Sequence, residues 1–240
     1  MYALPNYVSA IAFLIADPAR AAMLIALADG RALPAGELAY AAGVTAQTAS
    51  AHLAKLLDGG LLTVETEGRH RYYRLAGSHV ALALEHLAAV RSMGPARRQP
   101  LGREGRSLRF ARRCYDHLAG QLGVAVTQGL QERGFIASAA EKQFIVTPSG
   151  MEWFGSIGLE VAALKPSQRG LVRQCLDWTE RRHHLAGPLG VQLMAVLCSS
   201  GWLRRSKPSR IIQVTQKGWR ELKYHLNIDE SNAAFTPRHP

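Results

Sequence analysis

Residues 43–62 read GVTAQTASAHLAKLLDGGLL, and this stretch decides the fold of the N-terminal part of the chain. Gly43 can turn the backbone, Thr45 is a good helix N-cap, and the glycine pair at 59–60 ends the helix that follows. One face of this helix is expected to pack inward, because it carries three leucines at helical spacing, Leu53, Leu56 and Leu57. The polar N-terminal end of the same helix is then left exposed.

Three helices are expected before residue 45. Residues 4–15 carry apolar side chains at positions i, i+3, i+4 and i+7. A second helix starts at Asp17-Pro18 and ends at Asp29-Gly30, and residues 34–41 make a short third one. The third helix, the turn at Gly43 and the helix after it together predict a helix-turn-helix.

A β-hairpin is expected after the helix-turn-helix. Residues 61–65 and 70–75 read as two short strands joined through residues 66–69. A last helix from Ser78 to about Ser92 follows. The sequence therefore predicts a winged helix-turn-helix domain over residues 1–93.

This arrangement suits an interface with double-stranded DNA. The major groove admits one helix, and the residues at the N-terminal end of that helix reach the base edges. A carboxamide can bond adenine through two hydrogen bonds, hydroxyls bond bases or phosphates, and a basic hairpin tip suits the backbone or the minor groove. The expected contacts come from the helix and from the hairpin tip: Thr45, Gln47, Thr48, Ser50, His52, Lys55, Arg69, His70 and Arg71.

Residues 5–92 resemble the ArsR/SmtB family of regulators. The resemblance is carried by TAQTASAHLAKL at 45–56, GLL at 60–62 and GRHRYYRL at 68–75. It implies a homodimer whose interface is formed by the first and last helices of this domain. It also implies a transcriptional repressor that an effector releases from its operator.

The sequence departs from the family at its best-known metal sites. The family places cysteines on the helix before the reading helix, and residues 34–40 have none. A second family site uses Asp and His on the last helix, where this chain offers only His79, Glu85 and His86. These side chains make either a weak site or, more often, exposed surface histidines. A classical arsenic, cadmium or zinc sensor is therefore not predicted.

Composition and charge restrict the function classes. No apolar run approaches the roughly 18 residues that a membrane span needs, and the three cysteines are too few and too scattered for a disulfide framework. We therefore expect a cytoplasmic protein with no membrane partner. Residues 1–92 carry seven Lys/Arg and seven Asp/Glu, so the whole net charge of +11 comes from residues 93–240. A positive field attracts polyanions, nucleic acid first.

The chain after a linker at residues 94–102 contains a duplication. HLAGQLGV at 117–124 matches HLAGPLGV at 184–191 at seven of eight positions. Each copy has Cys-x-Asp upstream, then Gly-aromatic-apolar, then a strand ending in Val-Thr with a glycine three residues later. We predict a domain over residues 103–226 with two reduced winged-helix-like repeats, at about 114–155 and 175–222. Neither copy keeps a clear reading helix, and a flexible tail is expected at 227–240.

The duplicated region also holds a candidate effector or metal site. Its zinc-type ligands are Cys114, Asp116 and His117 in one copy and Cys175, Asp177, His183 and His184 in the other. If the copies pack about a pseudo-twofold axis, both cysteines and one Asp or His from each copy could surround a tetrahedral ion. The cysteines could instead be buried structural residues, which is the more common case.

Two further readings of this region stay open, so no cofactor is certain. Arg112 and Arg113 could lower the pKa of Cys114 and make it a redox sensor. An organic effector could instead occupy a pocket lined by aromatic side chains, although aromatics more often fill a core. The aromatic candidates are Tyr115, Trp153, Phe154, Trp178, Trp202 and Trp219.

The fold class predicted is mainly α with small β-hairpin wings, that is α+β, and the function predicted is sequence-specific DNA-binding transcriptional regulation. An architectural or protein-contact module of stacked winged helices is the alternative. A thiol-dependent enzyme fused to a DNA-binding domain is the third class. The sequence has no Gly-x-Ser-x-Gly, phosphate loop or Gly-x-Gly-x-x-Gly that opens a helix, so an enzyme is not predicted.

Overall fold

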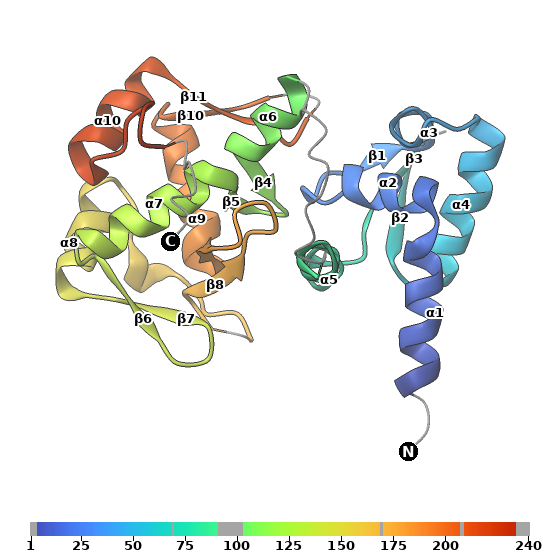
Figure 1. Ribbon diagram of the computed structural model, residues 1–240, viewed down its shortest axis with the longest axis horizontal. Helices are drawn as coiled ribbons and strands as arrows, with labels where there is room; N and C mark the ends of the chain where they lie inside the picture. Colours follow the sequence, from blue (N-terminus) through green and yellow to red (C-terminus); the bar gives the residue numbers. More distant parts are fainter. Residues whose placement is uncertain (1–3, 69, 91–102, 169, 207–208, 234–240) are drawn as a thin grey trace. The chain divides into compact units, whose positions relative to one another are not determined.

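The computed structural model describes residues 4–68, 70–90, 103–168, 170–206 and 209–233. The chain divides into two compact units, Met1–Leu84 and Glu85–Pro240, and each is described by itself (Figure 1). The predicted linker at 94–102 lies outside the described residues. The division into domains at 1–93 and 103–226 therefore stays a prediction.

The first unit contains the expected helices and hairpin. In chain order the elements are α1 (Leu4–Ala16), α2 (Pro18–Ala26), β1 (Leu33–Pro34), α3 (Ala35–Ala42), α4 (Ala46–Asp58), β2 (Leu62–Glu67), β3 (His70–Leu75) and α5 (Ser78–Ala89), whose residues from Glu85 on belong to the second unit. Asp17 caps α2 by accepting a hydrogen bond from the backbone N–H of Arg20, as the Asp-Pro pair predicts. The end predicted for the last helix, Ser92, falls outside the described residues.

The helix-turn-helix forms where the sequence places it. Gly43 ends α3 in the left-handed conformation, with φ of 65°, which glycine adopts without a steric cost. Three side chains of α4 face the core: Ala49, Leu53 and Leu56. They pack with α2 and α3, which hold α4 against the unit. The polar N-terminal end of α4 consequently faces outward.

The wing is a three-stranded antiparallel sheet in the order β1-β3-β2. The register runs from Leu62↔Leu75 to Glu67↔His70, so the hairpin is longer and its turn tighter than the sequence analysis assumed. Strand β1 pairs with β3 through Leu33↔Tyr73 and was not predicted. Two residues are too few to show the alternation that identifies a strand.

The second unit contains the duplication as two copies of one element order. The first copy consists of β4 (Arg112–Cys114), β5 (His117–Ala119), α7 (Gly120–Glu132), β6 (Ile136–Ala139), β7 (Gln143–Val146) and α8 (Pro148–Ser156). The second consists of β8 (Arg173–Leu176), β9 (His183–Ala186), α9 (Gly187–Ser199), β10 (Leu203–Arg205), β11 (Ile212–Val214) and α10 (Gln216–Leu226). Helix α6 (Arg103–Phe110) precedes both, and a 3-10 turn (Val161–Ala163) lies between them.

The two copies exchange strands with each other. The wing of the first copy joins the opening hairpin of the second in the sheet β6-β7-β8-β9. In that sheet the backbone N–H of Phe144 donates to Val172 O at 3.0 Å, and that of Gln174 to Lys142 O at 2.8 Å. The equivalent bonds join β11 of the second copy to β4 of the first.

In the second junction the N–H of Ile212 donates to Ala111 O at 3.0 Å and that of Arg113 to Arg210 O at 2.9 Å. All four residues are the repeat equivalents of the four in the first junction. The helices follow the same exchange, because α7 packs on β9 and α9 packs on β5 (Figure 1). The repeats are therefore related by an approximate twofold axis.

The glycines shared by the copies are needed by the backbone. Gly120 and Gly187 open α7 and α9 with φ of 81° and 76°, and a Cβ on either would meet a carbonyl oxygen within 3.0 Å. Gly150 and Gly218 lie against the carbonyl oxygens of Phe135 and Trp202, with no room for a Cβ. The glycines of the duplicated motif are thus required by the packing of the backbone in both repeats.

One core fills the second unit, and it includes part of the predicted tail. Ile228 and Ala233 are buried in the same apolar cluster as Leu222 and Leu226. The prediction of a flexible tail is therefore wrong for residues 227–233, because those two apolar side chains complete the core. Residues 234–240 lie outside the described residues.

The observed architecture confirms the predicted fold class of helices with small antiparallel hairpins. Helices α7 and α9, which occupy the place of a reading helix in each repeat, are largely buried, in agreement with the expectation that neither copy offers one. Within the described residues, no single helix is long and apolar enough to span a membrane. The bent pair Asn6–Ala16 and Pro18–Ala26 meets that length and composition together, at an angle of 88°.

Candidate DNA interface and a buried Cys/His cluster

The N-terminal end of α4 is an exposed polar edge. Thr45 caps the helix by accepting a hydrogen bond from the backbone N–H of Thr48 at 3.2 Å, and the two hydroxyl oxygens lie 2.9 Å apart. Gln47 and Ser50 are also exposed, and the Ser50 hydroxyl donates to the carbonyl of Ala46. The predicted base-contacting residues therefore lie together on the accessible end of one helix.

His52 differs from its neighbours in orientation. Its ring lies 3.9 Å from the Asp17 carboxylate and its side chain is only 16% exposed. The imidazole therefore lies against the start of α2, and the DNA contact of His52 stays a prediction. Lys55, one turn further along, is exposed as predicted.

The wing presents basic side chains near its tip. His70 and Arg71 are exposed, and the Arg71 guanidinium lies over the Tyr73 ring at 5.7 Å. Arg74 is paired with Glu65 at 2.7 Å, so its charge is partly offset within the hairpin. Arg69 lies outside the described residues.

A second group of functional side chains is buried at the centre of the second unit. Cys114 and His117 face each other across β4 and β5, and Cys175 and His184 face each other across β8 and β9. One donor atom from each of the four residues lies within 4.8 Å of the others. The two pairs are repeat equivalents, so the cluster lies on the approximate twofold axis.

The two histidines meet directly. Their Nε2 atoms lie 3.0 Å apart, so one ring donates a hydrogen bond to the other. The opposite nitrogen of each ring faces the Asp of its own copy. Nδ1 of His117 lies 2.9 Å from Asp116, and Nδ1 of His184 lies 3.6 Å from Asp177.

The predicted ligand set is therefore narrower in the structure. Asp116 and Asp177 lie behind the histidines and are not among the four converging side chains. His183 is exposed, because it precedes His184 on β9 and successive side chains of a strand point to opposite faces. The histidines of α5 are not part of any such group within the described residues.

Asp177 is the centre of a buried polar network. Both its carboxylate oxygens lie 3.1 Å from Nη2 of Arg112, a side chain that is itself fully buried. The carboxylate also accepts hydrogen bonds from the N–H of Gly120 at 2.7 Å and from Thr179 at 2.7 Å. Burial alone would raise the pKa of Asp177, but Arg112, His184 and these hydrogen bonds outweigh it and lower the pKa well below its usual range.

The prediction that Arg112 and Arg113 activate Cys114 is wrong. The pKa of Cys114 is raised to about 12, by its hydrogen bond with Cys175 and by burial. Arg112 points to Asp177, and Arg113 donates to the carbonyl of Tyr115. A protonated, buried thiol is a poor redox sensor and a poor nucleophile, which also weighs against a thiol-dependent enzyme.

The sequence analysis missed two features of this unit. Arg112 carries no sequence signal for burial, since Arg is among the residues least often buried and its partner is 65 residues away. Three of the expected aromatic pocket residues, Trp153, Phe154 and Trp202, are instead buried in the core, whereas Trp219 is half-buried and lines a cavity with Phe110 and Ile212. A polar cavity lies elsewhere and is lined by glutamines.

Comparison with known proteins agrees with this geometry. Residues 15–65 match the model of a helix-turn-helix domain. The uncharacterized HTH-type transcriptional regulator YdfF of Bacillus subtilis is 42% identical over 224 residues, 93% of this chain and 98% of that protein. The HTH-type transcriptional regulator CmtR of Mycobacterium tuberculosis is 45% identical over 76 residues, 32% of this chain and 64% of CmtR.

Solved structures match a smaller part of the chain. A homodimeric winged helix-turn-helix DNA-binding domain from Mycobacterium bovis, described as a possible ArsR-family regulator, is 34% identical. It covers 37% of this chain and 81% of its own, with a TM-score of 0.34. The relative from B. subtilis spans both units at 42% identity, and the chain belongs to the HTH-type transcriptional regulators, with a winged helix-turn-helix as its DNA-binding fold.

Proposed function

We propose that this regulator is a homodimeric repressor that binds a palindromic operator in the cytoplasm. Gln47, Thr48 and Ser50 read base edges in the major groove, and Lys55, His70 and Arg71 contact the backbone. The observation that carries this proposal is the polar N-terminal edge of α4, whose side chains are exposed.

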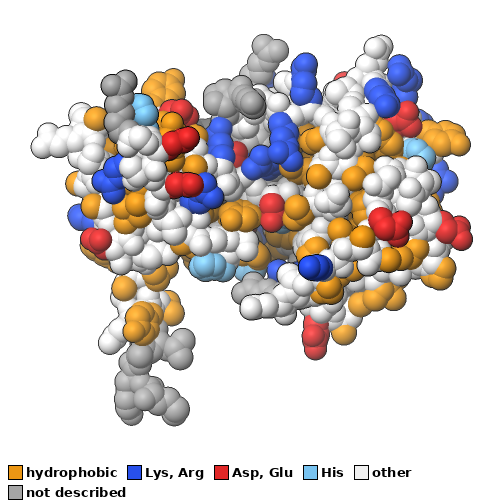
Figure 2. Space-filling model, turned by 180° about the vertical axis from the view of Figure 1, so that it is seen from behind, with side chains coloured by type: hydrophobic (Ala, Val, Ile, Leu, Met, Phe, Trp, Pro, Cys, Tyr) orange, Lys and Arg blue, Asp and Glu red, His pale blue; other side chains and the backbone are white. Residues whose placement is uncertain are grey.

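The exposed apolar face of α1 supports a dimer. Tyr7 is 69% exposed and Phe13 is 71% exposed, and Val8 lies between them in the chain. Figure 2 shows hydrophobic side chains on the part of α1 that projects from the first unit. Leu87 on α5 is also exposed. Large apolar side chains gathered on one helix mark an interaction site, and a second copy would cover them.

The proposed DNA interface can be tested by measuring how substitutions in α4 and in the wing change operator affinity. Gln47→Ala should weaken binding to the operator by about 1–3 kcal/mol and relax the preference at one base position. Arg71→Ala should weaken binding to all duplexes and flatten its salt dependence. Lys217→Ala, which removes an exposed charge from the second unit, is the control. Unchanged operator binding in both variants would overturn this form of the proposal.

We further propose that the effector site of the second unit holds a zinc-type metal ion. Two cysteines and two histidines that converge from four strands are the donor set of tetrahedral zinc sites. Asp116 forms a hydrogen bond with Nδ1 of His117, the arrangement that fixes the ring tautomer so that Nε2 can face a metal, and Asp177 lies 3.6 Å from Nδ1 of His184. Bound there, the ion would supply a cross-link between strands of both repeats.

We propose that metal binding regulates operator affinity, because the Cys/His cluster takes side chains from both repeats. Cys114 and His117 belong to one copy, Cys175 and His184 to the other, so occupancy of the site would favour one relative arrangement of the repeats. An ion whose binding shifts that arrangement can shift operator affinity by the same coupling energy. The metal-sensing role thus belongs to the second unit rather than to α3 or α5.

Elemental analysis of the purified chain tests the metal site. We expect one zinc-type ion per chain, with two of three thiols protected from a thiol reagent. Cobalt substitution should give the absorption of a tetrahedral site with two thiolates. Cys114→Ser should abolish both signals, and Cys198→Ser, a half-buried cysteine outside the cluster, should change neither. Equal metal content in both variants would contradict the proposal.

A further inference from the structure

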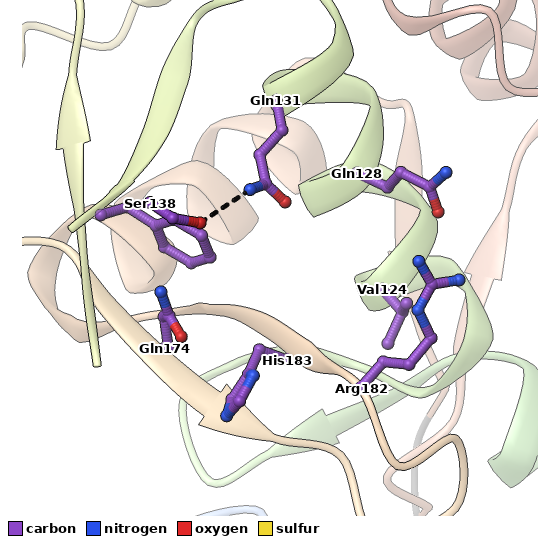
Figure 3. Close-up of a pocket in the computed structure, with 8 residues that line it drawn as sticks. Val124, Gln128, Gln131, Ser138, Gln174, Arg182 and His183 are labelled. Carbon is purple, nitrogen blue, oxygen red and sulfur yellow. Dashed lines mark hydrogen bonds between the residues drawn. The ribbon is translucent and has the colours of Figure 1, made fainter. Parts of the chain in front are cut away.

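A polar cavity lies between α7 and the four-stranded sheet, away from the Cys/His cluster (Figure 3). Its volume is about 170 Å³, and its polar lining is Gln128, Gln131, Ser138, Gln174, Arg182 and His183. Gln174 and His183 directly precede Cys175 and His184 on β8 and β9. Successive side chains of a strand point to opposite faces. One face of β8 and β9 therefore carries Cys175 and His184 of the Cys/His cluster, and the other face carries Gln174 and His183 of the cavity.

The three glutamines have their amide nitrogens already engaged. Nε2 of Gln128 donates to Glu132 at 2.6 Å, and Nε2 of Gln174 donates to the backbone carbonyl of Gln143 at 2.9 Å. Those acceptors have no proton to give, so the assignment of nitrogen and oxygen in both amides is fixed by chemistry. Nε2 of Gln131 donates to Ser138 at 3.1 Å, as Figure 3 shows.

The carbonyl oxygens of these amides are consequently left as acceptors. Oε1 of Gln128 is buried and accepts no hydrogen bond within the described residues. A buried acceptor without a donor costs about 1–3 kcal/mol, so a ligand that supplies the donor is stabilised there. The cavity therefore offers a ligand with hydrogen-bond donors a buried carbonyl oxygen that has no partner within the described residues.

The side chains that line the cavity limit the class of ligand further. The Glu132 carboxylate accepts the hydrogen bond from Gln128, and the lining also includes the basic side chain of Arg182. Phe144 and Val124 are buried and form the apolar part of the lining. A cavity of about 150 Å³ holds a benzene ring in another protein, so this one accommodates a single substituted ring.

The duplication supplies an internal control. The repeat equivalents of Gln128 and Gln131 are Ala195 and Cys198, on the matching turns of α9. The fold of the repeat therefore does not require carboxamides at these positions. Their presence in the first copy alone points to a role that the second copy lacks.

We propose that this cavity binds a small ring compound rich in hydrogen-bond donors, of the class of amidines and amino-substituted heterocycles. The ring lies against Phe144 and Val124, and its N–H groups donate to the carbonyl oxygens of Gln128 and Gln174. The inference is independent of the metal site, because the two sites use opposite faces of β8 and β9.

Calorimetric titration of the full chain tests the proposal with three probes. Benzamidine offers a ring and several N–H donors, 2-aminopyridine offers donors without a fixed charge, and benzoate offers the same ring size with acceptors only. We expect saturable binding of benzamidine and 2-aminopyridine at one site per chain, and no binding of benzoate.

Variants locate the binding. Gln128→Ala and Gln174→Ala should each weaken benzamidine binding by about tenfold, while Gln192→Ala, an exposed glutamine on α9, should leave it unchanged. Thermal unfolding of each variant confirms that the fold is retained. Benzoate binding as tight as benzamidine binding, no binding of either donor-rich probe, or equal affinities in wild type and Gln128→Ala would each overturn the proposal.

Discussion

The Nε2 atoms of His117 and His184 lie 3.0 Å apart, although 67 residues separate the two histidines along the chain. The contact joins the central hairpins of the two repeats, and each ring is backed by an Asp of its own copy. The polar groups at the centre of the second unit are therefore organised in pairs. Where two equivalent residues differ in burial or partners, we expect substitutions at the two positions to have different effects.

The Asp pair differs most in burial, and stability should follow that difference. Asp177→Asn removes the carboxylate nearest to the fully buried Arg112, which keeps only the longer ion pair with Glu85 at 3.8 Å, and should destabilise the second unit by about 3–5 kcal/mol. Asp116→Asn, at the equivalent position but 45% exposed, should cost less than about 1 kcal/mol. Urea unfolding followed by tryptophan fluorescence measures both. Similar costs for the two variants would show that the Arg112–Asp177 pair is not the anchor we describe.

Acidification should weaken the second unit through His225. Trp153 donates its indole N–H to Nδ1 of His225 at 3.1 Å, and the imidazole stacks on Trp202. Burial, helped by Arg133, lowers the pKa of His225 despite Glu221. A lowered histidine pKa means that the unfolded chain binds the proton more readily, so stability is present above the unfolded value of about 6.5 and is lost as the pH falls below it.

We therefore expect the free energy of unfolding to decline between pH 7.5 and 5.5, and the decline to be shallower in His225→Gln. Equilibrium unfolding across that pH range gives both slopes. A slope unaffected by the substitution would assign the acid sensitivity to other histidines.

Two glycines of α8 should respond oppositely to an added methyl group. Gly150→Ala places a Cβ against the carbonyl oxygen of Phe135 and should cost about 1–3 kcal/mol. Gly155 has open space around its Cβ position, so Gly155→Ala should be neutral or stabilise by up to about 1 kcal/mol. Thermal midpoints decide the matter, and a loss in both variants would mean that α8 resists alanine for another reason.

The cap of the reading helix should contribute to both stability and DNA affinity. Thr45→Ala removes the hydrogen bond to the N–H of Thr48 and should cost about 1 kcal/mol of stability, with weaker operator binding. Thr45→Ser keeps the hydroxyl and should restore both. Operator titrations and unfolding curves test this pair, and a Ser variant as impaired as the Ala variant would argue against capping.

Much of the first unit could be predicted because its signals are local. Asp17-Pro18, Gly43, Thr45 and the leucines of α4 each act within one turn of chain, and the structure has the helices they predict. The contact of His52 with Asp17 was not predicted, because it joins two helices and helical spacing alone does not reveal it.

The second unit was predicted less completely because its contacts are distant in sequence. The repeat gave the element order and both Cys/His pairs, but the exchange of strands that brings those pairs together depends on packing between copies. Arg112 and Asp177, 65 residues apart, have no local pattern that marks them as partners. The glutamine cavity could have been suspected from the comparison of Gln128 and Gln131 with Ala195 and Cys198.

The exchange of strands bears on how such a protein could have originated. One half-domain alone would hold a single Cys and a single His and would leave the edges of its two hairpins unpaired. Two identical half-domains that associate through those edges would acquire four donors in a single step, one pair from each chain. Fusion of the two genes would then have freed the halves to diverge, so that an ancestral assembly of equal partners became one polypeptide with a symmetric centre and dissimilar flanks.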